Sequence, residues 1–420
     1  MGRTGWIVAL AMAGAGFFIG RGLAPSTIAF PDPADGRSAE QMESEVARAL
    51  HESRAFARAS TLIRLFEGLT KENVEGAARA VRARSGEKDP VDLQLFLTAW
   101  AHLDARAAMQ EVQSWPIQSR RELGIRIVIR EWAASGRALE AGNYYESLTD
   151  PDQRALAAGP LVRGWVLGGD AEGALELARR FWEGEPRLDV IDALLQGTLH
   201  LEGADGVLAL ARELDPQAGG AFEQRIALAA LNLAGRENPV ATAAYYDELT
   251  RNGPAPWLAG NLVRIAGLLR NEDPAAALAW LLPKPENVER ARALTETTGT
   301  WAKRDLDAAW KWFEAHSAVS IGGREPLSAT DSSLLAGLVR RMARIRPAEA
   351  AQWAVRLRPE SDRVEMLRRV AYFWSASDPA AADRWLAGLE LADAERALID
   401  EAARWGRSGQ ADANSALGDL

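Results

Sequence analysis

Large apolar residues recur along this chain at nearly constant intervals. The separations are 32 and 33 residues from Trp100 through Trp132 to Trp165, and 32 from Leu269 to Trp301. Near the end of the chain, Met342, Trp374 and Trp405 are 32 and 31 residues apart. A period of 31–35 residues is typical of stacked helix–turn–helix units. Because alternating β-branched runs are absent, the sequence predicts an all-α fold.

One stretch, residues 374–385 (WSASDPAAADRW), indicates what a unit contains. Asp378 is a good N-cap and Pro379 suits the first position of a helix, so the stretch predicts one helix ending, a tight corner and a second helix beginning. Corresponding stretches begin at Leu269, Trp301 and Met342. In all four, a Trp lies seven residues beyond the corner; these residues are Trp280, Trp312, Trp353 and Trp385.

These units predict a right-handed α-solenoid of about ten stacked helical hairpins over residues 39–420. Each helix has an apolar stripe that it cannot bury alone, so neighbouring hairpins must stack. The 104 residues between Trp165 and Leu269 leave room for three units without a Trp marker. The two aromatic residues of a unit are expected to meet across its hairpin. The predicted structural markers are Trp100, Trp132, Trp165, Trp280, Trp301, Trp312, Trp353, Trp374, Trp385 and Trp405.

Residues 1–24 form the one targeting segment, with an apolar run at residues 6–20 between Arg3 and Arg21. A spanning helix needs about 20 apolar residues and a signal-peptide core roughly 7–15, so run length favours cleavage. Pro25 and Arg21 disfavour the available cleavage sites, and residues 22–24 could extend the span. We therefore expect a membrane anchor over residues 6–24, single-pass and N-in at a bacterial inner membrane, with the helical part in the periplasm. The alternative is a secreted or periplasmic protein after signal cleavage.

Residues 25–38 contain three prolines and a glycine and predict a flexible linker between the anchor and the helical domain.

Composition excludes several functions. The net charge of −9 argues against a nucleic-acid binder, and the absence of Cys excludes disulfides and thiolate metal sites. The four His residues are far apart, and no phosphate-binding or nucleophile motif is present. Acidic pairs such as Asp150/Asp152 and Asp305/Asp307 are interpreted as helix caps. The sequence thus predicts no catalytic, cofactor or metal site and no small-molecule substrate.

Two features are candidates for binding a partner. Tyr144-Tyr145 recurs as Tyr245-Tyr246 after 101 residues. Adjacent helical residues point about 100° apart, so one Tyr of each pair should be partly exposed and available to an interface. The second feature is the stretch 340–369, with nine Arg against four acids, in which Arg340, Arg341 and Arg344 are close in sequence. It could receive an acidic partner, although a solvated face with intrahelical ion pairs explains it as well.

The period, the hairpin build and the Ala and aromatic positions resemble those of tetratricopeptide-like α-solenoids. A Trp followed four residues later by Gly, as in Trp132/Gly136 and Trp405/Gly409, is similar to part of that family's pattern. The resemblance covers roughly residues 45–415 and implies a protein-interaction scaffold. Two other classes remain open: a targeting or regulatory subunit of a cell-envelope enzyme, and an α/α-toroid hydrolase acting on polysaccharide.

Overall fold

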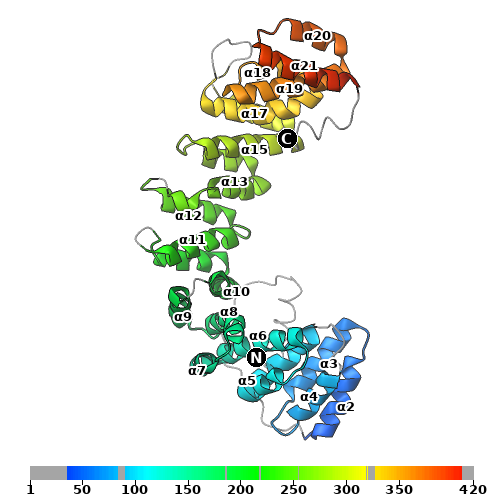
Figure 1. Cartoon of the computed structure of the whole chain (residues 1–420), viewed down its shortest axis with the longest axis vertical. Helices are drawn as coiled ribbons and strands as arrows, with labels where there is room; N and C mark the ends of the chain where they lie inside the picture. The colour runs from blue at the N-terminus through cyan, green and yellow to red at the C-terminus, as the bar shows by residue number, and fades with distance from the viewer. Residues whose placement is uncertain are drawn as a thin grey trace. The chain divides into compact units, whose positions relative to one another are not determined.

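The computed structural model describes residues 36–83, 90–184, 187–216, 219–253, 255–317, 319 and 327–408. Throughout these ranges the regular secondary structure is helical and contains no strand, which confirms the predicted all-α class (Figure 1). The predicted anchor, nearly all of the linker, and Gly409 lie outside the described residues. No helix within the described ranges is long and apolar enough to cross a lipid bilayer.

The chain divides into two compact units, of which the first ends at Leu233 and the second begins at Ala234. The elements of the first unit are α2 (Ala39–Leu50), α3 (Ala55–Glu67), α4 (Val74–Ala83), α5 (Pro90–Gln113), α6 (Gln118–Trp132), the π-helical turn η1 (Ala133–Arg137), α7 (Ala138–Ser147), α8 (Pro151–Leu167), α9 (Ala171–Gly184), α10 (Leu188–Glu213) and α11 (Ala221–Ala234).

The second unit contains α12 (Pro239–Thr250), the short 3-10 helix η2 (Pro256–Leu258), α13 (Asn261–Glu272), α14 (Pro274–Leu281), α15 (Val288–Arg304), α16 (Leu306–His316), α17 (Ala329–Ile345), α18 (Pro347–Ala354), α19 (Glu360–Ser377), α20 (Pro379–Ala387) and α21 (Asp393–Ser408).

The predicted corners are present and are capped as the sequence indicates. Asp273 accepts hydrogen bonds from the backbone N–H groups at the start of α14, Asp305 does so for α16, and Asp378 does so for α20. Each bond satisfies a backbone donor that a helix start would otherwise leave unpaired. The same corner occurs inside α5, which bends at Asp104, four residues after Trp100. Gly136 makes the corner after α6 with a positive φ of 80°, which glycine adopts without strain.

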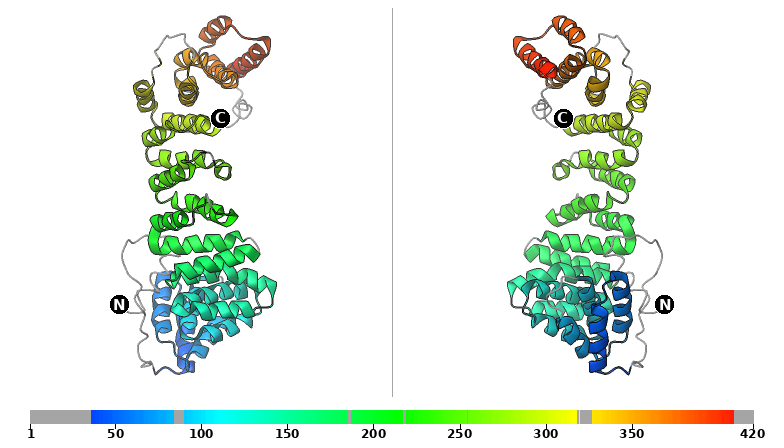
Figure 2. Two further views of the ribbon diagram at one scale, coloured as in Figure 1. Left: turned by 90° about the vertical axis from the view of Figure 1, so that its left-hand side faces the viewer. Right: turned by 90° about the vertical axis from the view of Figure 1, so that its right-hand side faces the viewer.

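Within each unit, the first helices of successive hairpins pack on one another. In the first unit α5 packs on α6, α6 on α8 and α8 on α10 (Figure 2). In the second unit α13, α15, α17, α19 and α21 make contacts in that order. We call each contact between two successive first helices a joint. Two joints contain a glycine at the point of closest approach: Gly337 of α17 lies against the backbone of α15, and Gly406 of α21 lies against that of α19. The helices approach so closely there because glycine has no side chain.

The expected aromatic contacts across hairpins are confirmed in the second unit. The ring centroids of Trp301 and Trp312 are 6.1 Å apart, and those of Trp374 and Trp385 are 5.4 Å apart. The marker positions are less uniformly buried than the repeat predicts. Trp100, Trp132, Trp165 and Trp353 are buried, whereas Trp280, Trp301, Trp312, Trp374, Trp385 and Trp405 are half-buried.

Candidate functional site

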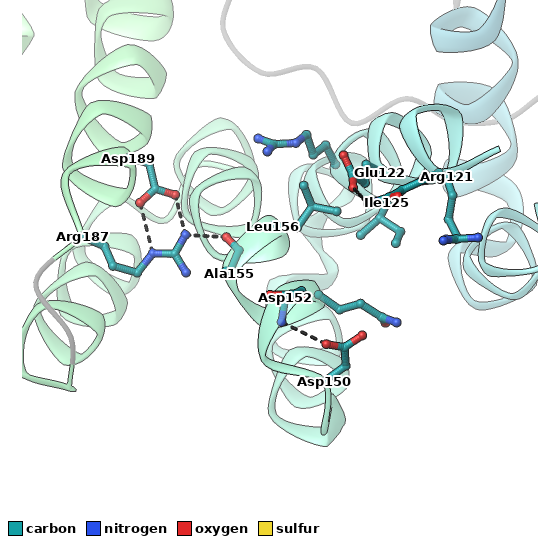
Figure 3. A pocket seen from close by; sticks show the side chains of 12 residues that line it. Arg121, Glu122, Ile125, Asp150, Asp152, Ala155, Leu156, Arg187 and Asp189 are labelled. Atoms are coloured by element: carbon teal, nitrogen blue, oxygen red, sulfur yellow. Dashed lines mark hydrogen bonds and ion pairs between the residues drawn. The ribbon is translucent and has the colours of Figure 1, made fainter.

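The first helices of three consecutive hairpins in the first unit enclose a hollow of about 610 Å³ where those helices begin (Figure 3). Charged or amide side chains predominate among the residues that line it, which come from the starts of α6, α8 and α10: Gln118, Arg121, Glu122, Ile125, Arg126, Asp150, Asp152, Gln153, Ala155, Leu156, Arg187 and Asp189. Enclosed small-molecule sites are lined mainly by apolar groups, so this lining is not typical of such a site.

Several of the charges in the hollow are held by local bonds. Arg187 donates from Nε and Nη2 to the two carboxylate oxygens of Asp189, at 3.1 and 2.8 Å, and it also donates to the Ala155 carbonyl (Figure 3). Asp150 accepts from the Asp152 backbone N–H at 3.0 Å and is the N-cap of α8, as predicted. These bonds fix the lining in place and give its acids a structural role.

The face that carries the hollow continues along the three helices toward the C-terminal ends of α6 and α8 and toward the bend of α10 at Gly203. Arg130 follows Arg126 by four residues on α6, Arg163 follows Leu156 by seven on α8, and His200 follows Asp189 by eleven on α10. In an α-helix these spacings return to nearly the same side. The docking face, as we name it, therefore combines an acidic and basic hollow at the helix starts with a row of basic groups at the helix ends.

A buried carboxylate anchors this basic row. Glu131 on α6 is 4% exposed. It accepts from Arg130 Nη2 at 2.6 Å, and its other oxygen lies 3.4 Å from His102 Nε2 on α5. Burial favours the neutral acid, but the hydrogen bond from His102 and the charge of Arg130 outweigh it and hold the pKa of Glu131 below its ordinary value.

The other members of the row have no such carboxylate of their own. Arg163 is half-buried, and its Nε has no hydrogen-bond partner among the described residues. Partial desolvation of the ring, together with the positive charges of Arg163 and Arg130, lowers the pKa of His200, although much of the residue is exposed. The positive charge of the row therefore lies on Arg130 of α6 and Arg163 of α8, and Glu131 acts on both of them.

Glu131→Gln tests this arrangement through the pH dependence of stability. The pKa of Glu131 is lowered in the folded state, so its stabilisation is fully present above the unfolded pKa and is lost as pH falls through the folded pKa. We expect the variant to be about 3–5 kcal/mol less stable at pH 7, because breaking a buried pair leaves charge uncompensated. The difference in the free energy of unfolding between the wild type and the variant should become smaller at pH values below the ordinary pKa of Glu. Urea unfolding of both proteins across this range measures it, and a pH-independent difference would contradict the ion pair.

Tyr144 lies next to the hollow and has a role that the sequence did not reveal. Its ring packs 5.3 Å from that of Trp132, so it is the aromatic partner across the α6–α7 hairpin. Its hydroxyl oxygen accepts from Gln113 Nε2 at 2.8 Å, and Gln113 also donates to Gln153 of the hollow at 3.3 Å. Tyr144 is half-buried, as predicted for one member of the pair.

Tyr145 is buried, with its ring 5.0 Å from that of Phe181. The prediction for the second pair is wrong, because Tyr245 is 2% exposed and Tyr246 is 8% exposed. The ring of Trp280 from the next hairpin covers Tyr246 at 5.9 Å. Burial also raises the pKa of Tyr246 to about 12. Neither ring of this pair is free to meet a partner.

The predicted arginine candidates lie on α17. Arg340 and Arg341 are half-buried and Arg344 is exposed. The stretch does contain the intrahelical ion pairs that were considered as an alternative, since Arg368 and Arg369 both contact Glu365. Arg346 instead reaches Asp307 on α16 at 2.7 Å. None of the three candidates has an ion-pair partner among the described residues.

Sequence reasoning missed Arg130, Arg163 and His200. A signal was available, because both arginines lie two residues before a Trp marker, and Arg340 lies two before Met342. This repeat position faces the next helix of the stack, as the contact between Gly299 and Gly337 shows. Basic residues at this position therefore lie between one first helix and the next.

In the described part of the chain, no three His, Asp or Glu side chains come together as a metal site requires. No protein-family model matches the chain, and no curated protein matches it. Among solved structures, the crystal structure of Ton1535 from Thermococcus onnurineus NA1 is similar over 88% of this chain and 99% of that one, at 15% sequence identity and a TM-score of 0.26.

Proposed function

We propose that this protein is a membrane-tethered helical-repeat scaffold that binds protein partners and does not itself catalyse a reaction. The observation that carries the proposal is the docking face on α6, α8 and α10. Its hollow of about 610 Å³ is lined mainly by polar and charged side chains, and the face ends in a row of basic groups. Such a pattern of both signs selects a partner and its orientation more than it adds affinity.

Each unit is proposed to be a stretch of right-handed α-solenoid, with about ten hairpins in the chain. Support comes from the packing of successive first helices on one another within each unit and from the repeated Asp-capped corners. In tetratricopeptide-like proteins, which the sequence resembles, stacked hairpins present an extended surface to partners. The docking face consists of such stacked first helices.

The tether is proposed from the sequence of residues 6–24. An N-in anchor would place the helical units in the periplasm of a bacterial cell, next to inner-membrane and cell-envelope proteins. A partner that is itself an envelope enzyme would make this chain its targeting or regulatory subunit.

Cross-linking with mass spectrometry in native membranes tests the proposal. The double variant Arg126→Glu/His200→Glu places negative charge at both ends of the docking face, and both positions are exposed. We expect recovery of the cross-linked partner to fall by about tenfold or more, because like charges across an interface are costly.

Arg180→Glu on α9 is the matched control, because Arg180 is exposed on a second helix of a hairpin, away from the docking face. It should leave partner recovery unchanged. Equal recovery for the wild type and both variants would contradict binding at this face. Cross-links that map to other helices would do so as well.

A further inference from the structure

The joint between α17 and α19 contains arginines where the preceding joint contains glycines. Gly299 lies two residues before Trp301 and meets Gly337, which lies five before Met342. At the same repeat positions, the next joint has Arg340, two before Met342, and Arg369, five before Trp374. The stacking register therefore places two guanidinium groups opposite each other.

The contacts of these residues agree with that register. The side chain of Arg369 is 8% exposed, and burial together with the nearby charge of Arg340 lowers its pKa. The Glu365 carboxylate forms ion pairs with two neighbouring arginines: it lies 3.1 Å from Arg368 Nη1 and 3.4 Å from Arg369 Nε. The Nε atoms of Arg340 and Arg368 are buried and have no hydrogen-bond partner within the described ranges, and the contact of Arg369 Nε with Glu365 is an ion pair without hydrogen-bond geometry.

Two acids on the neighbouring helices α18 and α21 pair with other arginines. Glu349 contacts Arg346, and Glu395 of α21 contacts Arg363. Three guanidinium groups against one carboxylate leave a net charge of +3 − 1 = +2 in a half-buried joint. Like charges in such a place repel one another more strongly than they would in water.

We propose that this arginine joint, formed by Arg340, Arg368 and Arg369 around Glu365, binds a phosphate group. A phosphate group has a charge of about −1.5 to −2 at pH 7, close to the charge that the joint leaves uncompensated. The planar donors of arginine match its oxygens, and charge-assisted hydrogen bonds of this kind are short and strong. Inorganic phosphate and the phosphate of a phosphorylated partner share this chemistry. The site lies in the second unit and does not depend on the docking face.

Titration of the full-length protein with inorganic phosphate, at ionic strength held constant with sodium chloride, tests the site by calorimetry and by thermal unfolding. We expect saturable binding and a rise in the unfolding temperature, since a ligand that binds the folded state stabilises it. Arg340→Gln removes one of the opposed charges. It should raise the unfolding temperature of the free protein and weaken phosphate binding by about tenfold or more.

Arg251→Gln is the control, because it removes one positive charge from an exposed position at the end of α12. Arg251→Gln should change neither the unfolding temperature of the free protein nor its affinity for phosphate. A second arm compares O-phosphoserine with serine: binding of O-phosphoserine indicates a site open to a phosphorylated partner, and binding of inorganic phosphate alone indicates a free-anion site. Absence of saturable phosphate binding, or equal binding by wild type and Arg340→Gln, would overturn the proposal.

Discussion

Replacing Trp132 with alanine is expected to lower the free energy of unfolding of the first unit by about 3–5 kcal/mol. Trp132 is 1% exposed and is among the largest fully buried side chains of the described residues. Its removal takes away the ring that packs on Tyr144 and leaves a cavity between α6 and α7 that the surrounding backbone cannot fill. Urea unfolding followed by circular dichroism measures the loss, and hydrogen exchange locates it in α6 and α7.

Trp312→Ala is the matched comparison in the second unit. Trp312 meets Trp301 across its hairpin but is half-buried, so its own side chain buries less apolar surface on folding than that of Trp132. We expect a loss of about 1–2 kcal/mol. If the two variants lose the same stability, the burial difference between the repeat markers has no energetic meaning.

Replacing Gly337 with alanine is expected to destabilise the second unit by about 1–3 kcal/mol or more. An added Cβ would lie 2.0 Å from Thr298 Oγ1, 2.5 Å from the Thr295 carbonyl oxygen and 2.6 Å from the Gly299 nitrogen. Two of these three atoms belong to the backbone of α15, so the joint must open to admit the methyl group.

Gly267→Ala on α13 provides a control of opposite sign. A Cβ there would meet only the far end of Arg270, at 3.6 Å. Since alanine is a better helix former than glycine, we expect a gain of about 0.5–1 kcal/mol. Urea unfolding of both variants tests the pair. A destabilising Gly267→Ala, or a neutral Gly337→Ala, would contradict the close packing of α15 and α17.

Hairpin corners were predictable because their signals are local. Asp378 and Pro379 act on the first turn of the helix that they begin, and the same holds at Asp273 and Asp305, so sequence spacing alone locates them. Contacts between the two helices of a hairpin were harder to predict. The corner around Gly136 makes Tyr144 the partner of Trp132, twelve residues away, whereas the Trp pairs of the second unit are eleven apart. A fixed spacing therefore could not identify Tyr144.

Candidate binding residues depended still more on tertiary contacts. The 100° argument correctly left Tyr144 half-buried but failed at Tyr246, because Trp280 of the following hairpin covers that ring. The excess of arginine in residues 340–369 was evident from sequence. Arg368 and Arg369 share Glu365 within α19, whereas the approach of Arg340 to Arg369 depends on how α17 meets α19. The docking face is formed by three helices, and neither their packing nor the burial of their side chains is visible in the order of residues.

The alternation of glycine and arginine joints has a mechanical consequence for the second unit. Gly337 and Gly406 let α15 meet α17 and α19 meet α21 at backbone contact, whereas the joint between α17 and α19 has Arg340 and Arg369 at the corresponding repeat positions. A pulling force applied along this unit would therefore separate α17 from α19 before it separates α15 from α17 or α19 from α21. The layer formed by α19, α20 and α21 would peel away as one piece.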